Sequence, residues 1–117
     1  RTHYIRVPDD HRIELRGGDG SANPYLAIAA ALGAGLDGIK RNLDPGPVGS
    51  VTEGSRALPP TLLHAVDELA GDEVITGVLD AAGNGVAKYF ADVKRDEFFS
   101  YHGTVSPWEI DQYLTAF

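Results

Sequence analysis

Two short stretches near the start of the chain alternate between polar and apolar residues, which is the pattern of β-strands with one covered face. They span residues 2–7 and 11–16, and residues 8–10 between them, Pro-Asp-Asp, are typical of a turn. We therefore predict a β-hairpin over residues 1–17 with a three-residue loop. This loop length places Arg6 opposite Arg12.

The predicted register sorts the hairpin side chains into two faces. The polar face collects Thr2, Tyr4, Arg6, Arg12, Glu14 and Arg16, and the apolar face collects Ile5, Val7, Ile13 and Leu15. We expect the apolar face to lie against a core and the polar face to meet something charged.

A long helix is predicted over residues 24–42. A Gly-rich break precedes it, Ser21 or Asn23 can cap it, and Pro24 occupies its first position. Apolar residues recur on one face at helical spacing: Tyr25, Ile28, Ala29, Leu32, Leu36 and Ile39. Small residues in this helix favour a close approach to a neighbouring sheet.

The sequence after residue 42 predicts a loop followed by several helices. Residues 43–58 are rich in Gly, Pro and Ser and predict a surface loop. Helices are expected within 59–117, at 61–70, 73–80 and 86–101, with a last one after the capping box formed by Ser106 and Glu109. Trp108 and the apolar face of the last helix can pack within the same chain or against a partner subunit, and we favour the same chain. The fold class predicted is α+β, with a β-hairpin and several α-helices.

Composition narrows the possible functions. The chain has 117 residues with 43% hydrophobic content, enough for one core or a piece of a larger domain. A net charge of −7 argues against nucleic acid as a partner, and the absence of cysteine excludes disulfides and thiolate metal sites. The longest apolar run, residues 26–36, is too short for a membrane span, so no membrane association is expected and cytoplasm fits. Because Arg1 already belongs to a strand-like alternation, we expect a fragment of a longer polypeptide.

The polar hairpin face sets one carboxylate, Glu14, between the guanidiniums of Arg12 and Arg16. One interpretation is a solvated strand face whose surface ion pairs contribute only ~0–1 kcal/mol. The other is a site for a divalent metal together with phosphate oxygens, because Glu supplies a hard oxygen ligand and Arg binds phosphate in a planar two-point geometry. Phosphoryl transfer requires both parts. The pattern alone leaves both interpretations open.

Two longer motifs carry a family resemblance. RTHYIRVP, followed by RIELRGGDGSANPYLAIAAALGAGLDGI, resembles the end of the catalytic domain in the glutamine synthetase family. The opening is most similar to type III glutamine synthetases and γ-glutamylmethylamide synthetases. The motif-level resemblance covers residues 1–42, and residues 59–117 resemble the family more loosely.

The resemblance implies an ATP-dependent ligase that phosphorylates the γ-carboxylate of glutamate and lets ammonia or a small amine displace the phosphate. It implies ATP and Mg²⁺ or Mn²⁺ as cofactors, a role in glutamine biosynthesis and nitrogen metabolism, and a ring-shaped homo-oligomer for the full-length protein. The hairpin would then belong to an antiparallel catalytic sheet packed with helices.

Site residues are implied position by position. Glu14 resembles the metal ligand among the nucleotide phosphates, and Arg16 resembles the arginine that contacts glutamate or the transferred phosphoryl group. Arg1 and Arg6 resemble arginines that contact ATP, and Arg12 sits where the family often has a basic residue beside the nucleotide. Arg16 and Arg1 are the candidate catalytic residues. Strict alternation places Arg1 on the face opposite Arg6, so both reach one site only if the chain twists or Arg1 lies in a loop.

Much of the family's site lies upstream of the motifs present here, including its other metal-binding glutamates and its ammonium-binding residues. We therefore expect the isolated chain to be inactive and to expose apolar surface. The acceptor, ammonia or an amine, stays open. The alternative is a non-catalytic, degenerate family member that acts as a binding or structural module.

Overall fold

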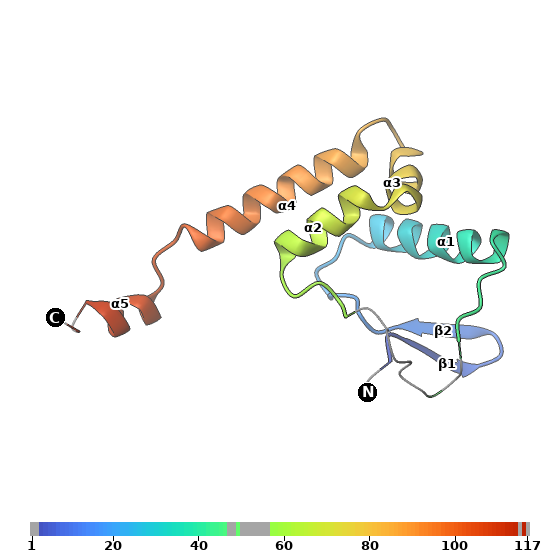
Figure 1. Cartoon of the computed structure of the whole chain (residues 1–117), viewed down its shortest axis with the longest axis horizontal. Helices are drawn as coiled ribbons and strands as arrows, with labels where there is room; N and C mark the ends of the chain where they lie inside the picture. The colour runs from blue at the N-terminus through green and yellow to red at the C-terminus, as the bar shows by residue number, and fades with distance from the viewer. Residues whose placement is uncertain (1–2, 47–48, 50–56, 115, 117) are drawn as a thin grey trace. The chain divides into compact units, whose positions relative to one another are not determined.

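The computed structural model describes residues 3–46, 49, 57–114 and 116. The chain forms two compact units, Arg1–Leu58 and Pro59–Phe117. Within the described residues it contains a two-stranded antiparallel sheet and five helices (Figure 1). This arrangement confirms the predicted α+β class.

The hairpin consists of β1, Ile5–Asp9, and β2, Arg12–Leu15. The strands are antiparallel, and β1 extends into the predicted loop. The residues that face one another are Ile5 with Leu15, Arg6 with Glu14, and Asp9 with Arg12. The predicted register, with Arg6 opposite Arg12, is therefore wrong.

A two-residue turn together with a β-bulge explains the difference. Between the paired positions, β1 has two residues, Val7 and Pro8, where β2 has only Ile13. Pro8 has no N–H to donate to the ladder, so a bulge is one of the few places where a strand accepts it. The turn then closes within two residues, and Asp9 Oδ1 accepts a hydrogen bond from the His11 backbone N–H at 3.0 Å.

The observed register still separates a polar face from an apolar face of the hairpin. Because directly opposed residues share a face, Arg6 and Glu14 lie on one side and Ile5 and Leu15 on the other. The bulge adds Asp9 to the polar face, opposite Arg12. The apolar face meets no core in the described chain, since Ile5 is 50% exposed and Leu15 is 43% exposed.

Helix α1, Pro24–Lys40, begins at a clear cap. The Asn23 side chain accepts hydrogen bonds from the backbone N–H groups of Tyr25 and Leu26, whereas Ser21 bonds to Asp19 instead. Of the two predicted candidates, Asn23 is therefore the N-cap residue of α1. The helix ends two residues short of the predicted boundary, where Asn42 adopts a left-handed conformation with φ 51°.

No described residue of α1 is buried. Leu32, at the centre of the predicted apolar face, is 63% exposed, and a Cβ at Gly35 would meet no atom within 4 Å. The close approach to a sheet that the small residues predict is therefore absent within the described part of this unit. The expected exposed apolar surface is present.

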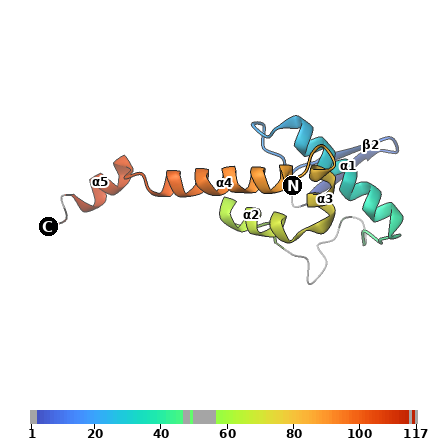
Figure 2. The ribbon, with the colours of Figure 1, turned by 90° about the horizontal axis from the view of Figure 1, so that it is seen from above.

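The second unit contains α2, Leu62–Gly71, α3, Glu73–Asp80, and α4, Val86–His102, which agree closely with the predicted helices. Helices α2 and α3 both pack against the N-terminal half of α4 and against each other (Figure 2). A small core lies between them. It consists of Val66, Leu79, Ala87 and Ala91.

Two aspartates fix the connections between these helices. Asp72 ends α2 and caps α3, because its Oδ1 accepts hydrogen bonds from the N–H groups of Val74 and Ile75. Asp80, at the end of α3, accepts a hydrogen bond from the Ala87 N–H at 2.8 Å. This bond caps α4, whose own cap residue, Gly85, offers no side chain.

Helix α5, Pro107–Tyr113, starts with the predicted capping box. Among the described residues it packs against none of the other helices of its unit, and Trp108 is 63% exposed. The predicted packing of this helix within the chain is therefore not found in the described part of its unit. None of the described helices combines the length and the apolar character needed to cross a membrane.

Candidate functional site

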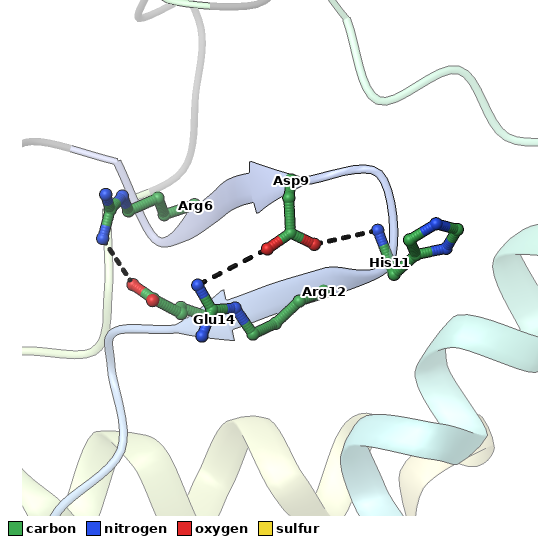
Figure 3. Close-up of polar contacts among 5 residues, drawn as sticks. All are labelled: Arg6, Asp9, His11, Arg12 and Glu14. Carbon is green, nitrogen blue, oxygen red and sulfur yellow. Dashed lines mark hydrogen bonds and ion pairs between the residues drawn. The ribbon is translucent and has the colours of Figure 1, made fainter.

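The charged face of the hairpin carries two ion pairs that bridge the strands (Figure 3). Arg6 Nη1 lies 3.1 Å from Glu14 Oε2, and Arg12 Nη2 lies 3.5 Å from Asp9 Oδ2. Each pair joins residues that are directly opposite in the ladder. The backbone register therefore decides which carboxylate each guanidinium meets.

Both pairs are open to solvent. The side chains of Arg6 and Glu14 are 53% and 38% exposed, and those of Arg12 and Asp9 are 61% and 53% exposed. Exposed ion pairs of this kind contribute ~0–1 kcal/mol. A ligand with higher charge density can therefore displace either partner at low cost.

Asp9 is the residue of this face that the sequence interpretation missed. The pattern assigned it to the loop, whereas it ends β1 and uses one carboxylate oxygen for the turn and the other for Arg12. The available signal was Pro8. A proline in an alternating strand indicates a bulge, and a bulge moves the next residue to the other face.

Arg16 continues the ladder beyond β2. Its backbone N–H donates to the Tyr4 carbonyl at 2.8 Å, so Arg16 and Tyr4 lie opposite each other on the polar face. Gly17 follows directly, and a Cβ there would overlap the Tyr4 ring. Glycine is therefore required for the ring to rest on this turn. The remaining candidate, Arg1, lies outside the described residues.

Glu14 fits a metal site as one ligand among several. Its carboxylate is a hard oxygen donor, half-exposed, on the face that also carries the guanidiniums. Within the described part of the chain, no group of three or more His, Asp or Glu side chains is placed to hold a metal ion. The other ligands of such a site must come from outside these residues.

Comparisons with known proteins agree on one family. A sequence profile described as "Glutamine synthetase, catalytic domain" matches residues 1–113. The glutamine synthetase of Halobacterium salinarum is 42% identical over 134 residues, which cover 100% of this chain and 28% of that protein. The glutamine synthetase of Archaeoglobus fulgidus is 41% identical over 122 residues, which cover 95% of this chain and 24% of that protein.

A solved structure is also similar. The structure described as "Apo GmaS without ligand" has a TM-score of 0.85 and 41% sequence identity, and the match covers 99% of this chain and 28% of that one. The chain therefore spans about a quarter of the length of the proteins it matches.

Proposed function

The chain belongs to the glutamine synthetase family, and we propose that it forms the C-terminal part of the catalytic domain of an ATP-dependent glutamate ligase. The observation that carries this proposal is the polar face of the hairpin. There Glu14 lies opposite Arg6 and between Arg12 and Arg16 along its own strand. A carboxylate surrounded by guanidiniums can bind a nucleoside triphosphate together with its metal ion, because the carboxylate can hold the metal and the guanidiniums can bind the phosphates.

The proposed reaction has two steps. A γ-carboxylate oxygen of glutamate attacks the γ-phosphorus of ATP, which gives γ-glutamyl phosphate and ADP. The nitrogen of ammonia or an amine then attacks the γ-carbonyl carbon, loses a proton, and phosphate leaves with the C–O bonding electrons. Because charge spreads over the transferred group, the protein contributes mainly positioning and neutralisation.

Each charged residue of the hairpin has a proposed role. Glu14 holds Mg²⁺ or Mn²⁺, which neutralises phosphate charge when it is bound. Arg16 contacts glutamate or the transferred phosphoryl group, and Arg6 and Arg12 contact the nucleotide phosphates. Arg1, outside the described residues, is proposed as a further contact to ATP.

The chain supplies one part of this site. A single described metal ligand, Glu14, does not complete a divalent cation site, so we expect the isolated chain to be inactive. The exposed apolar faces of the hairpin and of α1 are expected to be covered in the full-length protein, partly by the rest of the domain and partly in a ring-shaped homo-oligomer. We propose a cytoplasmic location.

Calorimetric titration of the full-length parent with ATP tests the nucleotide site, with and without Mg²⁺. Removing a charge-assisted hydrogen bond should weaken ATP binding by about tenfold or more in Arg6→Ala. In the Glu14→Ala variant, ATP binding should depend less on Mg²⁺, because the metal would lose one of its ligands. Arg41→Ala is the matched control, because Arg41 pairs with Asp37 within the α1 region at 3.1 Å and lies outside the hairpin. Unchanged ATP binding in both hairpin variants would refute the proposed site.

The nitrogen acceptor is a separate question. We propose ammonia or a small amine such as methylamine, since the resemblance extends to both types of ligase. Turnover of the full-length protein with ammonia and with a panel of amines distinguishes them. A strong preference for ammonia would assign a glutamine synthetase, and a preference for methylamine would assign a γ-glutamylmethylamide synthetase.

The second candidate function is a non-catalytic binding module. It is favoured by the two ion pairs, because carboxylates already neutralise Arg6 and Arg12, as on a solvated strand face. In that case Glu14→Gln would leave every measured property of the full-length protein unchanged, including ATP binding at saturating Mg²⁺.

A further inference from the structure

The hairpin places a cation on the proposed metal ligand. Arg6 Nη1 lies 3.1 Å from Glu14 Oε2, and the two residues are directly opposed across the strands (Figure 3). We propose that Arg6 competes with the divalent metal for the Glu14 carboxylate, and that nucleotide phosphates relieve this competition when they take the Arg6 guanidinium. The inference rests on the proposed function, because it takes Glu14 as metal ligand and Arg6 as phosphate contact.

The backbone brings this pair together. Directly opposed residues in an antiparallel ladder have Cβ atoms about 4.5–5.5 Å apart. The bulge lies between Arg6 and the turn, so it sets the register that makes Glu14 the opposite residue. Without the bulge, the same two-residue turn would place Arg6 opposite Leu15, and Arg6 and Glu14 would lie on opposite faces of the hairpin. The pairing is thus a consequence of the extra residue in β1.

Competition follows from charge. A carboxylate that accepts a hydrogen bond from a guanidinium has a positive charge within a few ångströms of the position a metal would take. Like charges at that separation repel, and a carboxylate oxygen shared between them binds each less well. The pair is exposed, so its strength is small and a phosphate group can draw the guanidinium away by two-point binding.

Arg6 and Arg12 differ in the carboxylate with which each one pairs. Arg12 has a carboxylate of its own, that of Asp9, at 3.5 Å. Arg6 shares the carboxylate that is proposed to bind the metal. The two arginines lie on the same face and carry the same charge, so Arg12→Gln controls for the loss of a positive charge near the site.

The test is to titrate the full-length parent with Mn²⁺ in the absence of nucleotide. Binding is measured as the decrease of the electron paramagnetic resonance signal of free Mn²⁺. The site that disappears in Glu14→Gln is the Glu14 site. We expect the Mn²⁺ affinity of this site to rise about two- to fivefold in Arg6→Gln, the range set by an exposed ion pair. Arg12→Gln should change it less.

A second titration separates competition from general electrostatics. At a saturating concentration of a non-hydrolysable ATP analogue, the phosphates hold the Arg6 guanidinium in the wild-type protein. The Mn²⁺ affinities of wild type and Arg6→Gln at the Glu14 site should then converge. A difference that persists unchanged would overturn the proposed relief by nucleotide.

The outcomes distinguish the inference from the proposed function. If Glu14→Gln removes a Mn²⁺ site but Arg6→Gln leaves its affinity unchanged or lowers it, the competition is overturned and the metal ligand stands. If Glu14→Gln retains every Mn²⁺ site at full affinity, both the metal assignment and the competition are overturned. Circular dichroism of each variant confirms that a lost site reflects a lost ligand and not an unfolded protein.

Discussion

The hairpin unit and the helical unit of this chain differ in where their stability comes from. In the helical unit, α2, α3 and α4 bury Val66, Leu79, Ala87 and Ala91 against one another. In the hairpin unit, none of the described residues is buried. Among its described residues, the unit that carries the candidate site therefore has no core of its own, whereas the helical unit has one.

We propose that this difference reflects the position of the candidate site in a larger domain. A charged strand face can line a ligand cavity only if the opposite, apolar face rests on other parts of the domain. In the proposed full-length protein, the exposed apolar side chains of β1, β2 and α1 would make those contacts. We therefore expect the candidate site to be the part of the chain that depends most on the rest of the protein.

The largest difference in stability between the two units is expected when one leucine in each unit is replaced by alanine. Leu79 is 5% exposed and Leu32 is 63% exposed. Leu79→Ala should lower the free energy of unfolding of the chain by about 2–3 kcal/mol, because it leaves a cavity in the core of the helical unit. Leu32→Ala should change it by less than about 0.5 kcal/mol. Urea denaturation followed by far-ultraviolet circular dichroism measures both.

The same pair in the full-length parent tests why α1 is exposed. There, Leu32→Ala should become as destabilising as Leu79→Ala, since the apolar face of α1 would be covered by the rest of the domain. An equally small effect of Leu32→Ala in both proteins would break the comparison. It would mean that α1 stays exposed in the full-length protein.

A smaller effect is expected at the cap of α4. Asp80→Ala removes the acceptor of the Ala87 N–H, a half-buried bond of 2.8 Å, and should cost about 1 kcal/mol of unfolding free energy. Asp92→Ala is the control, because Asp92 pairs with Lys88 on the exposed side of the same helix and should cost less than about 0.5 kcal/mol. Equal urea midpoints for the two variants would contradict the role of Asp80.

Local sequence signals predicted the helices well. Caps and proline positions fixed the starts of α1 and α5, and apolar spacing located α2, α3 and α4. These signals act within one or two helical turns, so they need no knowledge of the rest of the fold. The packing of α1 and α5 was not predictable in the same way, because their apolar faces have no partner among the described residues of their own units.

The hairpin shows the limit of such reasoning. Alternation identified the charged face, but the register depends on one extra residue in β1, and the bulge was not assigned. Consequently the pattern predicts Arg12 as the residue opposite Arg6, where the structure has Glu14, and it assigns Asp9 to the loop. The roles of Arg16, Arg6 and Glu14 toward ligands stay predictions.

At the hairpin turn, Asp9→Ala should lower the population of the native register more than Asp9→Asn. Alanine removes both the His11 hydrogen bond and the Arg12 ion pair, whereas asparagine keeps an acceptor for the His11 N–H. The expected difference is about 0.5–1 kcal/mol, the net value of one neutral hydrogen bond. Nuclear Overhauser effects between Ile5 and Leu15 report the register. Identical populations in the two variants would show that the turn does not depend on the Asp9 oxygen.

The smallest effect lies in α5, where a purely local interaction should hold without tertiary support. The Ser106 backbone N–H donates to Glu109 Oε2 at 2.7 Å, and this bond holds the pKa of Glu109 below the usual glutamate value. A carboxylate whose pKa is lowered by folding stabilises the helix above its unfolded pKa, and the stabilisation is lost as the pH falls through the folded pKa. Carboxyl chemical shifts of Glu109 should therefore give a titration midpoint below the usual glutamate value, and the first turn of α5 should loosen over the same pH range.

Glu109→Gln is the control, because glutamine keeps the capping box without titrating. A pH response that persists in Glu109→Gln would place the titrating group elsewhere and remove the capping box as its cause.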